Sequence, residues 1–325
     1  MAEEKAENLH RSVLLDEAVE LLNVNDGGTF VDATLGMGGH AERILELTKS
    51  SSVLAMDQDA DALGLARERL GHYGDRIKFF HSNFTEIKTV LSESGVSVVD
   101  GVLGDLGVSS LQLDSPERGF SFRFEAPLDM RMDATSDAPT AAELLATLSE
   151  VEIANIIYQY GEERFSRRIA RRIIERREAG TPVETTSQLV ELIERSVRRN
   201  PKDKIHPATR TFQALRIAVN RELEALEQFV TDAIDILKMN GRFAIITFHS
   251  LEDRIVKHAF RKMSGKCSCP PRIPQCVCGA RKVVEILTRK PIVPGEDEIA
   301  TNARSRSAKL RAVKKIGSAQ QNSTE

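Results

Sequence analysis

The chain has 325 residues, 41% of them hydrophobic and 29% charged, and a formal net charge of −3. This composition is typical of a soluble globular protein with one or two domains, and no apolar run approaches the ~18 residues that a membrane helix needs. The N-terminus is acidic and polar, unlike a secretory or organelle-targeting leader, so we expect a cytoplasmic protein without contact to a membrane.

An amphipathic helix is expected over 12–23, and the first distinctive stretch follows it. Residues 29–35 are mostly β-branched or apolar and predict a buried strand, after which Gly36, Gly38 and Gly39 predict a turn and 41–47 a helix. A strand, a glycine turn and a helix open many nucleotide-type cofactor sites. Glycines let the backbone bend and approach the ligand, and the helix start offers unpaired N–H groups. A purely structural glycine turn is the alternative.

Two aspartates refine this prediction. Asp57 ends a predicted strand over 52–57, at the place where an acid binds ribose hydroxyls in such folds. The glycine spacing also fits a loose dinucleotide fingerprint, which leaves NAD open. Asp32, just ahead of the glycines, suits a cationic amino-acid ligand and favours S-adenosylmethionine instead.

Strands and helices then alternate, which predicts right-handed βαβ units and a parallel sheet. Further strands are expected at 76–83 and 98–105, and helices at 60–70 and 84–93. From 113 to 211 the pattern is only helix and loop, with helices at 140–148, 151–160, 162–178 and 187–199. The sheet pattern returns with a broken helix over 208–237, a strand at 242–249, a helix at 251–263 and two half-exposed antiparallel strands near 283–288 and 307–313. We therefore predict an α/β domain, residues 1–112 and 212–325, with an all-helical insertion, residues 113–211.

Asp105 ends the fourth predicted strand, at the edge where ligands bind to such sheets. A polar residue there can accept hydrogen bonds from an amine and hold it near a methyl donor, a proximity effect. Asp105 is therefore the first catalytic candidate, with Ser109 and Ser110 as helpers. The alternative is that Asp105 only caps the following turn.

Charge is distributed unevenly along the chain. Residues 151–221 hold fifteen Lys or Arg and nine Asp or Glu, and residues 304–315 hold six basic residues and no acidic one. A basic excess within a near-neutral protein predicts a polyanionic partner, unless it is only a solvated helix surface. The arginines of 162–177 and the basic loop 201–210 are the expected phosphate contacts, together with the basic tail. The long loop over 117–133 combines acids, arginines and Phe, and would either grip a base and its phosphate or stabilise itself internally.

Several blocks together resemble one bacterial family, the 16S ribosomal RNA cytosine-N4 methyltransferases, also called the small-subunit methyltransferase H or MraW family. The blocks that carry the resemblance are Gly-Met-Gly-Gly-His40, Asp-Gln-Asp59, Gly-Asp-Leu-Gly-Val-Ser-Ser110, Glu-Arg-Gly-Phe-Ser-Phe122, Pro-Leu-Asp-Met-Arg-Met-Asp133, Tyr-Gly-Glu-Glu-Arg-Phe165, Arg-Thr-Phe-Gln-Ala-Leu-Arg216 and Thr-Phe-His-Ser-Leu-Glu-Asp-Arg254. The resemblance runs from about residue 10 to 315. One departure is Gly104, where the family commonly has Leu before the aspartate.

The resemblance implies a class I, Rossmann-like methyltransferase sheet with an inserted helical domain. It also implies transfer of a methyl group from S-adenosylmethionine to N4 of one cytidine in the decoding region of 16S rRNA, with 16S rRNA or the 30S subunit as partner. By motif matching, the cofactor contacts are expected at Gly38, Gly39, His40, Asp57, Phe84, Asp105 and Gln112.

His249 is a secondary catalytic candidate, because it ends a predicted strand at the ligand edge and lies in a family block. A lone histidine near acids is more often a structural residue. The four cysteines, Cys267, Cys269, Cys276 and Cys278, lie within a dozen residues. In a cytoplasmic protein this clustering favours a structural zinc ion over disulfides, with reduced thiols as the alternative.

Three alternatives to an rRNA methyltransferase follow from the same sequence. One is a DNA N-methyltransferase, and another is a small-molecule N-methyltransferase, which the basic insertion disfavours. The third is a nucleotide-sensing RNA-binding protein without turnover. A homodimer is compatible with the sequence, which does not determine the oligomeric state.

Overall fold

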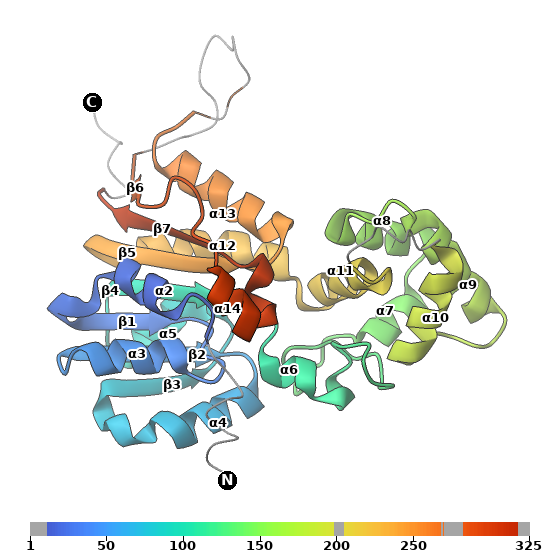
Figure 1. Cartoon of the computed structure of the whole chain (residues 1–325), viewed down its shortest axis with the longest axis horizontal. Helices are drawn as coiled ribbons and strands as arrows, with labels where there is room; N and C mark the ends of the chain where they lie inside the picture. Colours follow the sequence, from blue (N-terminus) through green and yellow to red (C-terminus); the bar gives the residue numbers. More distant parts are fainter. Residues whose placement is uncertain (1–11, 198–204, 268, 270–281, 318–325) are drawn as a thin grey trace. The chain divides into compact units, whose positions relative to one another are not determined.

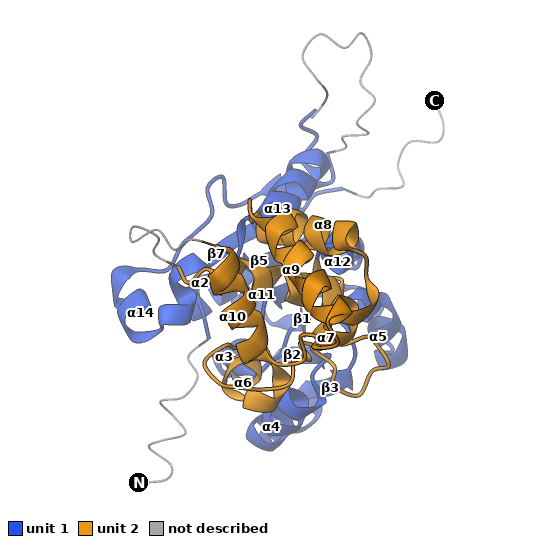
Figure 2. Ribbon diagram, turned by 90° about the vertical axis from the view of Figure 1, so that its right-hand side faces the viewer, with its two compact units in different colours: residues 1–107, 223–325 blue, residues 108–222 orange. Residues whose placement is uncertain are grey.

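The computed structural model of the chain describes residues 12–197, 205–267, 269 and 282–317. The chain forms two compact units, residues 1–107 with 223–325 (unit 1) and residues 108–222 (unit 2), which are coloured separately in Figure 2. The sequence placed the insertion at 113–211. The structure extends unit 2 to 222 because the helix over 208–220 packs into the core of that unit.

Unit 1 is built on a seven-stranded sheet with the order β3-β2-β1-β4-β5-β7-β6 (Figure 1). The strands are β1 Gly28–Asp32, β2 Ser51–Asp57, β3 Ile77–His81, β4 Val99–Asp105, β5 Leu237–Thr247, β6 Val284–Ile286 and β7 Lys309–Lys315. The first five pair in parallel, whereas β7 runs antiparallel to both β5 and β6. The predicted α/β class with a terminal antiparallel pair is confirmed.

Helices cover both faces of this sheet. The helices of unit 1 are α2 Leu15–Leu22, α3 Gly39–Leu47, α4 Ala60–Leu70, α5 Ile87–Ser94, α12 Glu222–Asp235, α13 Ser250–Met263 and α14 Glu296–Thr301. One core contains buried residues of α2, α3 and α4, and the other contains those of α5, α12 and α13 (Figure 1). Because apolar side chains cover both faces, the parallel strands read as continuous apolar runs, which is how the sequence identified them.

Unit 2 is helical and has a core of its own. Its helices are α6 Ser110–Asp114, α7 Ala141–Thr147, α8 Glu150–Gly161, α9 Ser166–Glu178, α10 Thr186–Ser196 and α11 Ala208–Asn220. Ile153, Ile157, Ile169 and Ile193 are fully buried in this core. Capping boxes begin α7, α8 and α10, where a Ser or Thr hydroxyl accepts from the third helical N–H.

The two last strands differ in one respect from the sequence prediction. A half-exposed, alternating β7 was expected, but residues 310–313 are buried on both faces because β7 lies between β5 and β6. In the described part of the chain, no helix combines the length and apolar character that a bilayer crossing requires.

Candidate functional site

Three aspartates meet at the carboxyl edge of the sheet. Asp32, Asp57 and Asp105 are the last residues of β1, β2 and β4, which are neighbours in the sheet. The carboxyl ends of parallel strands form the edge where ligands bind in open α/β sheets. The Thr34 hydroxyl accepts the N–H of Asp105 at 2.6 Å and so joins the ends of β1 and β4.

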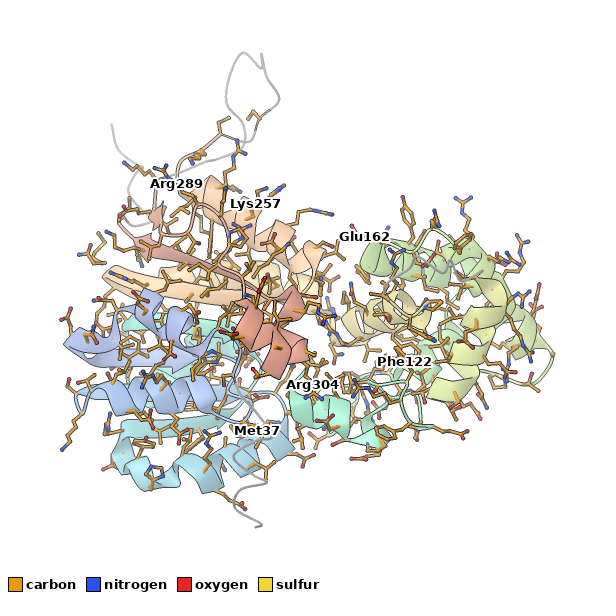
Figure 3. All side chains as sticks on the ribbon, in the orientation of Figure 1. Met37, Phe122, Glu162, Lys257, Arg289 and Arg304 are labelled. Atoms are coloured by element: carbon orange, nitrogen blue, oxygen red, sulfur yellow. The ribbon has the colours of Figure 1, made fainter. Side chains whose placement is uncertain are left out.

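The glycine turn between β1 and α3 borders this edge. Gly36 has φ +51°, and a Cβ built on it would meet no atom within 4 Å. Its N–H donates to Asp57 Oδ2 at 2.7 Å, and the N–H of Asp59 donates to Asp57 Oδ1 at 2.8 Å. The turn therefore presents bare backbone to open space beside an oriented carboxylate. Met37, the next residue of the turn, is labelled in Figure 3.

Gly38 and Gly39 serve the packing of the turn. Gly38 has φ +81°, and a Cβ there would lie 2.5 Å from Leu70 Cδ1. At Gly39 a Cβ would lie 2.2 Å from Ser12 Oγ. These two residues were predicted as cofactor contacts, and the structure gives each a steric reason that needs no ligand.

Gly38 is tightly packed whereas Gly36 borders open space, so substitutions of these two glycines form a matched pair. Gly38→Ala should lower the free energy of unfolding by about 2–4 kcal/mol, because the new methyl group clashes with Leu70 and φ is positive. Gly36→Ala should cost only about 1 kcal/mol, from its positive φ alone. It should nevertheless weaken ligand binding at the sheet edge at least ~10-fold, because the methyl group occupies the space beside Asp57. Urea unfolding and calorimetric titration measure the two effects, and equal stability losses would contradict the assignment.

The pKa of each of the three aspartates is raised above the ordinary value of an aspartate. Burial raises the pKa of Asp32 to about 7, against hydrogen bonds from backbone N–H groups and with repulsion from Asp57. Burial also raises the pKa of Asp57 to about 6, against hydrogen bonds from Asp59 and Gly36. The pKa of Asp105 lies well above its usual value because of burial first and then repulsion by Asp32, Glu252 and Glu298.

Two of these carboxyls have an oxygen without a partner. Among the described residues, no hydrogen-bonding group reaches Asp32 Oδ2 or Asp105 Oδ1, and both atoms are buried. A buried carboxylate oxygen without a partner is costly, and a bound cation or donor removes that cost. The donor set at this edge therefore fits a ligand with positively charged groups.

His40 lies beside Asp105. Its Nε2 is 3.1 Å from the carbonyl oxygen of Val13, and its Nδ1 is 3.9 Å from Asp105 Oδ2. Only 4% of His40 is exposed. The sequence predicted His40 as a cofactor contact, and the structure places it behind the carboxyl edge, between the N-terminal segment and Asp105.

Phe84 follows β3 in a short 3₁₀ turn, Phe84–Glu86. Its ring packs on Phe229 with the ring centroids 4.9 Å apart. Phe229 also fixes Gly104, where a Cβ would lie 2.9 Å from the Phe229 ring. The departure from the family pattern at Gly104 is therefore matched by a large aromatic neighbour.

Ser109 and Gln112 form the capping box of α6. The Ser109 hydroxyl accepts from the N–H of Gln112 at 3.2 Å, and Gln112 Oε1 accepts from the N–H of Ser109 at 3.0 Å. Both residues belong to unit 2. Their predicted roles in catalysis and cofactor binding stay predictions, and the structure adds a structural role for each.

His249 begins α13 and caps it. Its Nδ1 accepts from the N–H of Glu252 at 3.4 Å, whereas its buried Nε2, 3.1 Å from Glu252 Oε1, makes no hydrogen bond within the described residues. Glu252 Oε2 in turn accepts from the N–H groups of Phe248 and His249. The cap at Nδ1 gives His249 a structural role. Its catalytic role stays a prediction.

The loop over 117–133 is stabilised by its own arginines. Arg118 donates to the carbonyl oxygens of Arg131 and Met132, and the Arg131 guanidinium pairs with both oxygens of Asp129 at 2.8 Å. Asn220 fastens the same loop by donating to the carbonyl oxygen of Met130 and accepting from the N–H of Met132. The internal network, one of the two readings of this loop, is the one that the structure shows. Phe122, labelled in Figure 3, stacks on His206 with centroids 4.9 Å apart.

The basic tail and the basic loop that the sequence predicted as phosphate contacts are described to different extents. The last strand uses its cations internally, because Lys309 and Arg311 pair with Asp253, Lys314 pairs with Glu285, and Lys315 donates to the carbonyl oxygens of Asp235 and Leu237. That the basic tail contacts a polyanion stays a prediction, and the structure gives these four residues internal contacts as well. Residues 201–204 of the predicted basic loop over 201–210 lie outside the described residues.

The arginines of α9 are used differently. Arg167, Arg168 and Arg171 are exposed residues of α9, and Arg171 lies four and three positions after the other two, so the three share one side of the helix. Arg167 and Arg168 form no ion pair with any described residue, whereas Arg171 lies 3.7 Å from Glu150. Arg177 is structural, since it donates to the carbonyl oxygens of Leu145, Ala146 and Leu148.

The cysteine cluster is only partly described. Cys276 and Cys278 lie outside the described residues, and the N–H of Cys269 lies 3.4 Å from the Cys267 sulfur. The zinc prediction for Cys267, Cys269, Cys276 and Cys278 therefore stays a prediction.

Sequence reasoning missed residues that approach this edge from distant segments. Glu298 of α14 accepts from the N–H of Leu14 at 2.9 Å and adds negative charge near Asp105. Val13 and Thr34 orient His40 and Asp105. No local pattern marks these residues, because their partners lie 27 to 284 positions away in the chain.

Comparison with known proteins places these observations in a family context. A model of the MraW methylase family matches residues 7–316. The chain is 52% identical to a ribosomal RNA small subunit methyltransferase H of Brevibacillus brevis, over 94% of this chain and 98% of that protein. It is 50% identical to the protein of that name from Geotalea uraniireducens, with the same coverage. Among solved structures, a putative rRNA methylase from Clostridium thermocellum matches 95% of this chain and 100% of its own with a TM-score of 0.43 and 11% identity.

Proposed function

The chain belongs to the MraW methylase family, and on that premise we propose that it methylates N4 of one cytidine in the decoding region of 16S ribosomal RNA. Methylation of small-subunit rRNA with S-adenosylmethionine agrees with the name of its relatives. The N4 position and the single cytidine rest on the sequence motifs quoted above. A cytoplasmic location is part of the proposal.

The partly unpaired carboxyls at the sheet edge are the observation that supports this proposal. Asp32 Oδ2 and Asp105 Oδ1 are buried without a partner among the described residues, and burial favours the protonated form of both side chains. S-adenosylmethionine carries a sulfonium and an ammonium group, so its charge complements this edge. A dinucleotide, with its negatively charged pyrophosphate, does not.

Different residues at the sheet edge are assigned to different parts of the cofactor. We assign Gly36 and Asp57 to the ribose side, because an oriented carboxylate stands beside bare backbone there. Asp32 is assigned to the cationic amino-acid part and Phe84 to a flanking aromatic contact. When bound, the cofactor supplies an electrophilic methyl group. Gly38, Gly39 and Gln112 stay predicted contacts, for which the structure gives structural roles as well.

Asp105 is assigned the substrate amine. Its ionised carboxylate accepts hydrogen bonds from the amine and holds the nitrogen in one orientation, which converts an encounter into an aligned geometry. Burial of the carboxyl excludes water and strengthens that interaction. The amine loses a proton once it carries the methyl group, so no strong base is required. The target cytosine has to leave its stack to reach such a site.

The exposed arginine stripe of α9 is the proposed contact to the rRNA backbone. Arg167, Arg168 and Arg171 present three guanidinium groups on one side of a helix whose other side is buried. Arg167 and Arg168 have no carboxylate partner among the described residues, so phosphates are their natural counterions.

A double substitution tests this surface. Arg167→Gln with Arg168→Gln should weaken binding to 30S subunits about 10-fold at physiological salt and lower the salt slope by about 2, because two phosphate contacts are lost. The matched control is Arg43→Gln with Arg195→Gln, which removes the same charge from arginines paired with Asp16 and Glu191. Filter binding at several salt concentrations measures both. An equal loss in the two variants would show that only net charge matters.

Transfer of a tritiated methyl group tests the function itself. The purified chain is incubated with labelled S-adenosylmethionine and with 30S subunits, naked 16S rRNA or DNA, and the modified nucleotide is then mapped. Label at N4 of one cytidine in the 30S or rRNA sample supports the proposal. Label only in DNA or in a small molecule favours the other methyltransferase classes. Cofactor binding without any transfer favours an RNA-binding sensor. Sedimentation of the same sample decides between monomer and homodimer.

A further inference from the structure

We propose that Phe248 is a substrate-binding residue whose ring stacks on the target cytosine and holds the exocyclic amine of that base against Asp105. The inference rests on the proposed function, because it names the side chain that binds the base at the same edge of the sheet. Both residues belong to unit 1. The contact makes and breaks no covalent bond, since stacking orients the base before the methyl group is transferred.

The register of the sheet places Phe248 close to Asp105. Asp105 pairs with Ile246 across β4 and β5, and Phe248 follows Ile246 by two residues. Side chains alternate along a strand, so Phe248 lies on the same face as Ile246 and packs on the core that contains Ile246 and Leu103. Asp105 follows Leu103 by two residues and lies on that face as well. With strands about 4.8 Å apart and a rise of about 3.3 Å per residue, the backbones of Asp105 and Phe248 are about 8 Å apart, a span that suits a pyrimidine ring and its amine.

Gly107 leaves room for the Phe248 ring at the end of β4. Gly107 has φ +106°, and a Cβ built on it would lie 3.2 Å from Phe248 Cδ2. Any other residue would be strained at this φ and would press a side chain against the ring. The ring therefore packs on bare backbone, two residues beyond Asp105.

The backbone of Phe248 is held by the segments on either side of it. Its N–H donates to Glu252 Oε2 at 2.7 Å, and His249 forms the capping box of α13 with the same glutamate. Thr247 is fully buried, and its hydroxyl donates to the carbonyl oxygen of Lys309. A side chain on such a fixed strand end is held more precisely than one on a loop, which suits a surface that has to orient a base.

The Phe248 ring is only partly buried, and among the described residues no aromatic ring or guanidinium group stacks on it. Phe84 and Phe229, in contrast, pack on each other. A base that leaves its stack loses the contact with its neighbours, and an aromatic side chain restores such a contact. Stacking fixes the plane of the base, whereas Asp105 fixes its amine. The alternative is that Phe248 only covers the apolar core beneath it.

Two substitutions separate stacking from packing. Phe248→Leu keeps an apolar side chain but removes the aromatic face, whereas Phe248→Tyr keeps that face. Phe248→Leu should lower kcat/KM for 30S subunits at least ~10-fold, while Phe248→Tyr should stay within about threefold of the parent. Neither change should alter the affinity for S-adenosylmethionine by more than about twofold, because the ring is assigned to the base. Steady-state transfer, calorimetric titration and thermal unfolding measure activity, cofactor affinity and folding.

Fluorescence gives a second readout that needs no methyl transfer. The chain contains no tryptophan, so Phe248→Trp places a single indole at the end of β5. With S-adenosylhomocysteine present, naked 16S rRNA should reduce the emission of this variant by roughly half, because a base stacks on the indole. The matched control is Val98→Trp, at an exposed position just before β4 and so at the opposite end of that strand from Asp105. The emission of the control should stay nearly constant.

The outcomes are distinct. A folded Phe248→Leu protein with the parental kcat/KM would overturn the inference, as would equal quenching of Phe248→Trp and Val98→Trp. If Phe248→Leu does not fold, the comparison of the two tryptophan variants decides alone. A parent protein that transfers no methyl group to any RNA would instead overturn the proposed function, and quenching confined to Phe248→Trp would then still assign a base to this ring.

Discussion

Asp105→Ala should reduce methyl transfer to 30S subunits by at least ~100-fold while cofactor binding changes less than about fivefold. The reason is that the carboxylate is assigned to the amine and its loss removes the orientation of the nucleophile. Asp105→Asn keeps the shape and one acceptor oxygen, so it should retain more activity than the alanine variant. Single-turnover transfer measures the rate, and calorimetric titration measures cofactor binding.

The fold should tolerate the Asp105 substitutions. The contact that joins β4 to β1 uses the backbone N–H of Asp105 and the Thr34 hydroxyl, which both variants keep. Removal of a buried carboxyl with an unpaired oxygen also removes a cost of burial. Turnover at the parental rate in Asp105→Ala would remove Asp105 from the mechanism, even with the family assignment unchanged.

Asp32→Asn should make the free protein more stable at pH 8 and at the same time weaken S-adenosylmethionine binding at least ~10-fold. The pKa of Asp32 is about 7 in the folded protein, whereas the ordinary pKa of an aspartate is 3.8. The folded state therefore binds the proton more tightly than the unfolded chain does, and the parent loses stability as the pH rises from about 4 to about 7. At pH 8 this loss is complete and amounts to roughly 4 kcal/mol at most.

Because an asparagine side chain cannot ionise, the Asp32→Asn variant does not lose this stability as the pH rises. Its unfolding midpoint should exceed that of the parent by several degrees at pH 8 and by little at pH 4.5. The matched control is Asp100→Asn, in which the altered carboxylate accepts from the N–H of Thr29 and pairs with Lys238, so stability should fall. Differential scanning calorimetry at the two pH values measures the unfolding midpoints of the parent and both variants. A lower midpoint for Asp32→Asn at pH 8 would contradict the predicted pH dependence.

Much of the sheet could be predicted because its strands are apolar runs that end at glycines or acids. The helix over 60–70 matches α4 without error, and the strands that end at Asp57 and Asp105 end where they were predicted. Parallel strands with both faces covered carry this signal in their own residues. Asp105 could be selected as a candidate because a strand end is a local feature.

Structural roles were harder to predict where they depend on distant partners. The basic strand over 309–315 resembles a polyanion-binding tail by charge alone, yet Asp253, more than fifty positions earlier, neutralises Lys309 and Arg311. In contrast, the capping roles of Ser109 and His249 have a local signature, since Gln112 and Glu252 follow three residues later. The family blocks that contain Ser109 and His249 therefore also contain the residue spacing of a helix N-terminus.

The path of the chain through the sheet of unit 1 has a consequence for its synthesis. β7 lies between β5 and β6, and α14 supplies the carboxylate that binds Leu14, a contact across 284 residues. A nascent chain therefore lacks the strand between β5 and β6 until residues 309–315 have left the ribosome. Unit 2, whose core lies entirely within 108–222, has all its parts available earlier. We expect limited proteolysis of stalled nascent chains to find the helical unit protected first, and unit 1 protected only once residues 296–315 have emerged.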